Sequence, residues 1–73
     1  MFEILKKISD QIKLARANYQ KTVIVDFPGG HDYDISWEVI RQLAINGYHA
    51  SFSNNYVNTF DSPVIVTEYE IQI

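Results

Sequence analysis

Hydrophobic residues recur at helical spacing over residues 2–19. On a helix at about 100° per residue, one arc gathers the side chains of Ile4, Leu5, Ile8, Ile12, Ala15 and Tyr19. Leu14 lies away from this arc. A basic strip of Lys6, Lys13 and Arg16 runs beside it. The pattern predicts an amphipathic helix whose apolar face packs on a core.

A strand and a second helix are expected next. Residues 22–27 form a β-branched run, and the Pro-Gly-Gly segment that follows predicts a loop at 28–32. Asp34 or Ser36 is expected to cap a helix that starts after this loop, because short polar side chains accept hydrogen bonds from the free N–H groups of a first helical turn. Gly47 predicts the end of this helix.

The second helix and the segment after it each show one apolar face. The helical wheel places Trp37, Val39, Ile40, Leu43 and Ala44 on the core side. Ile45 falls on the polar side of the same wheel. Residues 48–53 alternate strictly, with Tyr48, Ala50 and Phe52 on one face and polar residues on the other. This alternation predicts a half-buried strand.

Two interpretations fit residues 54–62. One is a nine-residue loop. The other, which we favour, has a tight turn at Asn54-Asn55, a short strand at 56–60 and a second turn at 61–63. Residues 64–73 predict a closing strand. Its apolar face holds Ile65, Tyr69, Ile71 and Ile73.

These elements predict one α+β domain over residues 1–73, in the order α-β-α-β-(β)-β. The strand-helix-strand unit places its two strands parallel. Both helices then cover one face of a small mixed sheet of three to four strands, which gives a two-layer α/β sandwich. The far face would carry Ile24, Val64 and Val66 among polar residues. These aliphatics indicate contact with another surface, or cover by edge loops.

Charge divides the chain into two parts. The net charge is −3, but residues 1–21 carry +3 and residues 22–73 carry −6. No cysteine is present, which excludes disulfides and thiol chemistry and suits a reducing cytoplasm. The first residues are too charged for a signal peptide, and no apolar run reaches the length of about 18 residues that spans a membrane. We expect a cytoplasmic protein that binds no membrane.

The loop at 28–34 is the first candidate for chemistry. His31, Asp32 and Asp34 carry groups that can hold a divalent ion, but their spacing matches no defined metal loop. Gly29-Gly30 offers backbone donors to a phosphate, yet no Lys-Ser/Thr follows and two aspartates stand nearby. Catalytic motifs are absent as well. We therefore expect no metal, no cofactor and no enzymatic activity.

The uncharged stretch at 42–60 is the second candidate. It mixes aromatic side chains, which supply contact area, with short amides, which donate and accept hydrogen bonds, as adaptable binding loops do. The predicted partner-binding residues combine this stretch with four aliphatic residues that the predicted core does not use. They are His49, Asn54, Asn55, Tyr56, Asn58 and Phe60, together with Ile24, Ile45, Val64 and Val66. The alternative is an ordinary hairpin that buries its aromatics.

Several segments together carry a resemblance to a known group. They read Ala-Arg-Ala-Asn-Tyr at 15–19, Val-Ile-Val-Asp-Phe at 23–27, Ile-Ser-Trp-Glu-Val-Ile-Arg-Gln-Leu at 35–43 and Asn-Gly-Tyr-His-Ala-Ser-Phe at 46–52, with a strand at the C-terminal end. This arrangement resembles the small uncharacterised α/β proteins that tailed bacteriophages and prophages encode. The resemblance implies a bacterial host cytoplasm and transfers no functional residue.

Three functions are consistent with these features. The leading one is a non-enzymatic protein that binds and inhibits or modulates a host protein, such as a defence or nucleic-acid enzyme. The second is a self-assembling structural or virion-associated subunit, and hence a homo-oligomer. The third is an oligomeric sponge for a nucleotide signal, using the basic strip and the Gly29-Gly30 loop. Direct nucleic-acid binding is disfavoured because the −6 body repels a polyanion.

Overall fold

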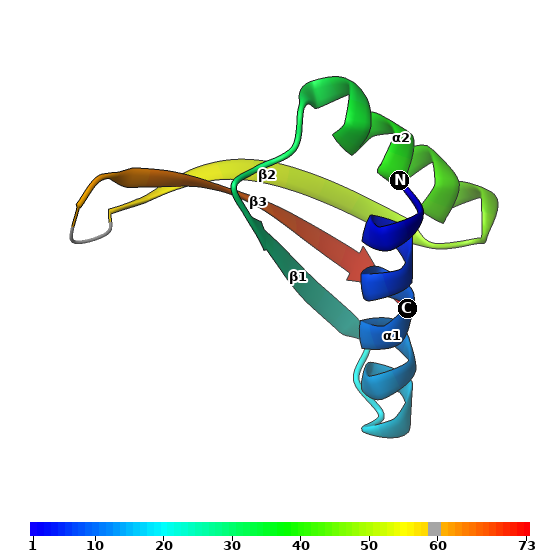
Figure 1. Ribbon diagram of the computed structural model, residues 1–73. Coiled ribbons are helices and arrows are strands. Elements are labelled where there is room, and N and C mark those ends of the chain that lie inside the picture. The colour runs from blue at the N-terminus through cyan, green and yellow to red at the C-terminus, as the bar shows by residue number, and fades with distance from the viewer. Residues whose placement is uncertain (59–60) are drawn as a thin grey trace.

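The computed structural model describes residues 1–58 and 61–73, which form two helices and three strands (Figure 1). In chain order they are α1 (Phe2–Ala17), β1 (Thr22–Pro28), α2 (Tyr33–Ile45), β2 (His49–Asn58) and β3 (Pro63–Gln72). The predicted α+β class is confirmed. Within the described residues, no helix combines the length and apolar character needed to cross a membrane.

The last strand lies in the middle of the sheet. The strand order is β1-β3-β2, and β3 pairs antiparallel with both neighbours. The strands β1 and β2 therefore run parallel to each other, as predicted, without being hydrogen-bonded neighbours. The central strand β3 is antiparallel to both of its neighbours. The described residues therefore contain no parallel pair of hydrogen-bonded strands. The sequence had left the place of this strand open.

Both helices cover the same face of the sheet. One buried cluster joins Ile8, Ile12 and Ala15 of α1, Val39 and Leu43 of α2, Val23 and Val25 of β1, and Tyr69 and Ile71 of β3. The cluster confirms the two-layer arrangement and the predicted apolar faces of the strands. The opposite face of the sheet is open, with Ile24 58% exposed.

Tyr19 does not belong to the core, contrary to the helical wheel. The helix ends at Ala17, and Tyr19 adopts a left-handed backbone conformation with φ 57°. Its amide donates to the carbonyl of Arg16, which closes the last turn. The chain has therefore left the helical path before Tyr19, and its side chain is 94% exposed.

The start of α2 also differs from the prediction. The helix begins at Tyr33 with Asp32 as its N-terminal cap residue, and the Asp32 side chain makes no cap hydrogen bond. Ser36 is buried inside the helix, so neither predicted cap is correct. Trp37, which the wheel placed in the core, is 56% exposed. Gly47 ends the helix as predicted, with φ 88°.

The nine-residue loop at 54–62 is wrong because residues 54–58 belong to β2, and the favoured alternative is correct only in placing residues 56–58 in a strand. Asn54 and Asn55 do not form a turn, because they pair with Thr67 and Val66 inside the β2–β3 ladder. The pairing of β1 ends at Pro28, opposite Val66. Beyond that point, residues 56–58 of β2 and residues 63–65 of β3 continue as a two-stranded extension that projects from the body (Figure 1). We refer to this extension as the arm.

The arm explains the failed prediction. Among the described residues, no helix and no third strand cover the arm, so its residues follow no alternation between a core and water. Phe60 lies outside the described residues.

Candidate binding surfaces

An uncharged hollow lies beside the free edge of β2. Tyr33 and Trp37 of α2 face Phe52 of β2 edge-to-face, with ring centroids 5.5 and 5.3 Å apart. The hollow measures about 410 Å³ and is lined by Tyr33, Trp37, Ile40, Ala50, Ser51, Phe52, Ser53 and Asn54. Apolar rings at such a site supply contact area at a small cost in side-chain entropy. We refer to it as the edge groove.

Local helix geometry creates the aromatic wall of the edge groove. Residues four apart share one face of a helix, so Tyr33 and Trp37 stand one above the other. Neither residue was predicted from the sequence to bind a partner, and Trp37 was expected in the core. Two large aromatics at this spacing, beside a strand carrying Phe52, were the available signal.

Four of the ten predicted partner-binding residues, Asn54, Asn55, Tyr56 and Asn58, lie on β2 at the base of the arm or within it. Tyr56 is 76% exposed, and Asn55 and Asn58 are exposed too. Asn54 differs from them, since its Oδ1 accepts a hydrogen bond of 2.6 Å from the buried Thr67 hydroxyl. Asn54 therefore has a structural role. The Asn55 amide donates to Ser53 Oγ at 3.3 Å, while the exposed Tyr56 ring and Asn58 lie further out on β2.

The predicted aliphatic face is only partly apolar. The strand register places Ile24 opposite Glu70 and Asp26 opposite Glu68, with Ser51 and Ser53 on the other side of these two glutamates. Partial loss of hydration, followed by repulsion from Asp26 and Glu70, raises the pKa of Glu68. The open face therefore combines an exposed isoleucine with a crowded group of carboxylates.

The remaining predicted contacts lie in three places. Val64 lies within the arm and Val66 at its base, both half-buried on β3. His49 is exposed at the start of β2, at the other end of the sheet. Ile45 is 65% exposed at the C-terminal end of α2, away from the edge groove at its N-terminal end. The structure does not gather them into one surface.

The candidate metal residues are separated by the orientation of His31. Its Nδ1 lies 2.7 Å from the Tyr69 hydroxyl, and its backbone N–H donates to Thr67 Oγ1 at 2.8 Å. Asp32 and Asp34 are exposed instead. Within residues 1–58 and 61–73, no group of three or more His, Cys, Asp or Glu is placed to hold a metal ion. His31 belongs to a partly buried polar network with Thr67 and Tyr69.

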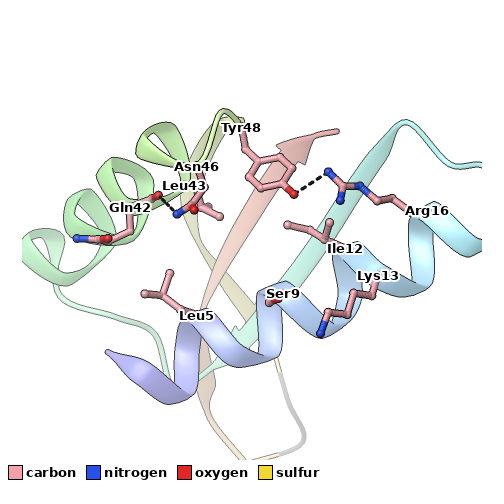
Figure 2. Close-up of a pocket in the computed structure, with 9 residues that line it drawn as sticks. All are labelled: Leu5, Ser9, Ile12, Lys13, Arg16, Gln42, Leu43, Asn46 and Tyr48. Carbon is pink, nitrogen blue, oxygen red and sulfur yellow. Dashed lines mark hydrogen bonds between the residues drawn. The ribbon is translucent and has the colours of Figure 1, made fainter.

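A second groove separates the two helices (Figure 2). It measures about 410 Å³ and is lined by Leu5, Ser9, Ile12, Lys13, Arg16, Gln42, Leu43, Asn46 and Tyr48. The Arg16 guanidinium donates to the Tyr48 hydroxyl at 2.7 Å and lies 5.4 Å from the centre of that ring. Arg16, one of the two basic residues that line this groove, is thus already engaged within the protein.

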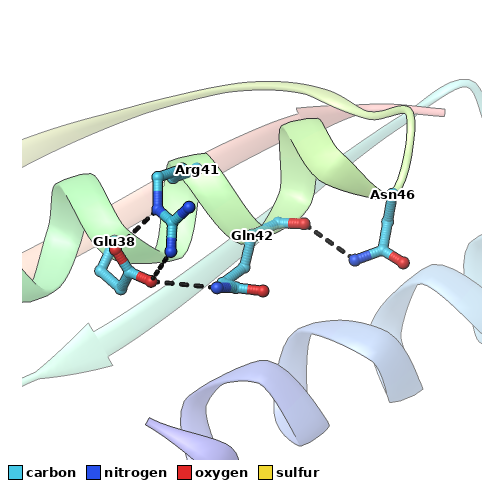
Figure 3. Close-up of polar contacts among 4 residues, drawn as sticks. All are labelled: Glu38, Arg41, Gln42 and Asn46. Carbon is cyan, nitrogen blue, oxygen red and sulfur yellow. Dashed lines mark hydrogen bonds and ion pairs between the residues drawn. The ribbon is translucent and has the colours of Figure 1, made fainter.

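The α2 wall of this groove is held by its own contacts (Figure 3). Glu38 accepts hydrogen bonds from Arg41 at 2.8 Å and from the Gln42 amide at 3.0 Å. These bonds lower the pKa of Glu38 to about 2. The Asn46 amide donates to the Gln42 carbonyl at 2.8 Å. The amides beside the groove therefore already have partners.

The two features of the predicted nucleotide site are not brought together. Arg16 contacts Tyr48, which precedes β2. Gly29 follows the C-terminal end of β1 and donates to the Ile65 carbonyl. Since β1 and β2 are parallel, these positions lie at opposite ends of the sheet.

No protein-family model, curated protein or solved structure matches the chain. The functional argument therefore rests on the surfaces described above.

Proposed function

We propose that this chain is a non-enzymatic protein-binding module, encoded by a bacteriophage or prophage, that binds a host protein in the bacterial cytoplasm and inhibits or modulates it. The phage setting follows from the resemblance noted in the sequence. A defence or nucleic-acid enzyme is the class of host partner that we propose.

The observation that carries this proposal is the uncharged aromatic surface along β2. The edge groove exposes Tyr33 and Trp37, and Tyr56 follows on the same face of β2, four residues beyond Phe52. Tyrosine and tryptophan are the residues most often dominant in protein interfaces. Because no charged side chain lines the groove, a partner can cover it without removing a charge from water.

Affinity capture followed by a matched pair of variants tests the proposal. The tagged protein is used to capture partners from a bacterial lysate, and the affinity of the purified partner is then measured by calorimetry. Trp37→Ala and Tyr56→Ala should each weaken binding about tenfold or more. Leu14→Ala is the control, because Leu14 on α1 is 57% exposed, against 56% for Trp37.

Two results would contradict the proposal. One is the absence of any partner retained above the level of the bare matrix. The other is a partner that binds Trp37→Ala, Tyr56→Ala and Leu14→Ala with equal affinity, while circular dichroism shows all three folded.

A further inference from the structure

The two edge strands of the sheet differ in how they are protected. On β1, the Lys7 ammonium donates to the Asp26 carbonyl at 3.1 Å and lies 4.5 Å from the centre of the Phe27 ring. The strand ends in Pro28, which has no N–H to donate. Lysine, charge and proline on an edge are the features with which soluble proteins prevent pairing with a further strand. The edge at β1 is therefore blocked.

None of these features is present on β2. Its ten residues, His49–Asn58, include no lysine, arginine, acid or proline. They pair one-to-one with β3 from His49 to Asn58, without a bulge. In the strand order β1-β3-β2, no strand of the described chain lies on the outer side of β2. Alternate residues of such an edge direct N–H and C=O groups outward, where another strand can pair.

The edge groove lies at this open edge. Five consecutive residues of β2, 50–54, line it, with Tyr33 and Trp37 beside them. A strand paired with β2 would direct every second side chain to the helix side of the sheet, against these rings and Phe52. Apolar side chains fit that environment because they bury ring surface without leaving a polar group unpaired.

The other side chains of such a strand would meet a different environment. They would project over Ser51 and Ser53, whose cross-strand partners on β3 are Glu70 and Glu68. Two strand spacings, about 10 Å, separate an added strand from β3. Lysine and arginine are long enough to approach the carboxylates across this distance. Since Asp26 adds a third carboxylate beside Glu68, the open face favours basic side chains.

We propose that the outer edge of β2 binds an extended segment of the partner protein in which apolar side chains alternate with lysine or arginine. This inference rests on the proposed function and specifies how the partner is recognised, namely by strand addition. A second copy of the chain lacks the required charge, because its β2 would present His49, Ser51 and Ser53 to the open face.

Nuclear magnetic resonance with a defined peptide tests this inference. The ¹⁵N-labelled protein is titrated with a blocked nine-residue peptide of alternating valine and lysine. We expect saturable shifts confined to the amides of 49–55 and the indole of Trp37. A peptide with glutamate in place of lysine should bind at least about tenfold more weakly. A peptide with N-methyl groups on its internal residues should lose binding to a similar extent, because it has no ladder donors.

Each alternative outcome is decisive. Equal binding of the N-methylated peptide would overturn pairing at the edge, and equal binding of the glutamate peptide would overturn the basic specificity. Concentration-dependent shifts of residues 49–55 without peptide, together with a dimer in sedimentation, would assign the edge to a second copy. If Trp37→Ala weakens a captured partner while the peptide shifts no amide of β2, the proposed function stands and strand addition is wrong.

Discussion

The imidazole Nδ1 of His31 lies 2.7 Å from the hydroxyl of Tyr69, and this contact ties the loop after β1 to the centre of the sheet. Tyr69 is fully buried on β3, and its hydroxyl also donates to Ser36 Oγ at 3.3 Å. The Phe27 ring stacks near both, 4.7 Å from the His31 ring and 5.6 Å from the Tyr69 ring. The half-buried loop histidine is thereby anchored to a residue of the core.

The position of His31 predicts a loss of stability in mild acid. Burial lowers the pKa of His31 from 6.5, and the positive charges of Lys7 and the N-terminus lower it further. The unfolded chain therefore binds a proton more readily than the folded one. The free energy of unfolding should decrease as the pH falls from about 7.5 through 6.5 towards the lowered pKa. Urea unfolding at a series of pH values measures this.

A pair of histidine variants isolates this contribution. His31→Gln removes the titrating group, so its stability should depend less on pH in this range than that of the natural protein. His49→Gln makes the same exchange at an exposed position of the open face and is the control. An unchanged slope in His31→Gln would show that another group causes the effect.

The Thr67 hydroxyl predicts a second effect on stability. It accepts the His31 N–H at 2.8 Å and donates to Asn54 Oδ1 at 2.6 Å, while Thr67 itself is fully buried. Thr67→Val keeps the shape and removes both bonds, which should lower the free energy of unfolding by about 1–3 kcal/mol. Thr67→Ser keeps the hydroxyl. Exchange of the His31 amide should accelerate in Thr67→Val alone, and equal exchange in both variants would contradict this account.

The two loop glycines are expected to differ in their tolerance of alanine. Both have positive φ, 92° for Gly29 and 73° for Gly30. A Cβ at Gly29 meets no atom within 4 Å, so Gly29→Ala should cost only backbone strain of about 1–2 kcal/mol. A Cβ at Gly30 would overlap the Ile65 side chain, so Gly30→Ala should cost clearly more. Thermal unfolding of the two variants compares them, and equal melting temperatures would contradict the overlap.

Local periodicity was sufficient to predict most of the fold. The faces of β1 and β3, the exposure of Leu14 and Ile45, and the end of α2 at Gly47 all follow from short-range patterns. The central place of β3 could not be predicted, because either neighbour is compatible with its alternation. The prediction that Tyr19 faces the core was wrong because the helix ends two residues before it.

The binding surfaces were predicted less completely. The uncharged, aromatic composition made the β2 segment a candidate for binding, but composition does not reveal that the strand continues past Asn55 as an arm. Tyr33 and Trp37 become a groove wall because α2 packs over β2, the edge strand that carries Phe52. Such relationships depend on tertiary packing, which a single sequence does not encode locally.

The carboxylates of the open face predict a stabilising substitution. Partial desolvation, the Asp26 carboxylate and Glu70 raise the pKa of Glu68 above 4.5, so the folded state holds this proton more tightly than the unfolded state. The stabilising contribution is present in acid and is lost as the pH rises through the raised pKa. Glu68→Gln should therefore increase the melting temperature near neutral pH, and the gain should vanish below pH 4.5.

Asp10→Asn is the control for this substitution, since it makes the same change in net charge at an exposed position of α1. It should leave the melting temperature near that of the natural protein. An equal gain in both variants would attribute the effect to net charge alone. A gain for Glu68→Gln that persists unchanged in acid would show that the charge of Glu68 is not its cause.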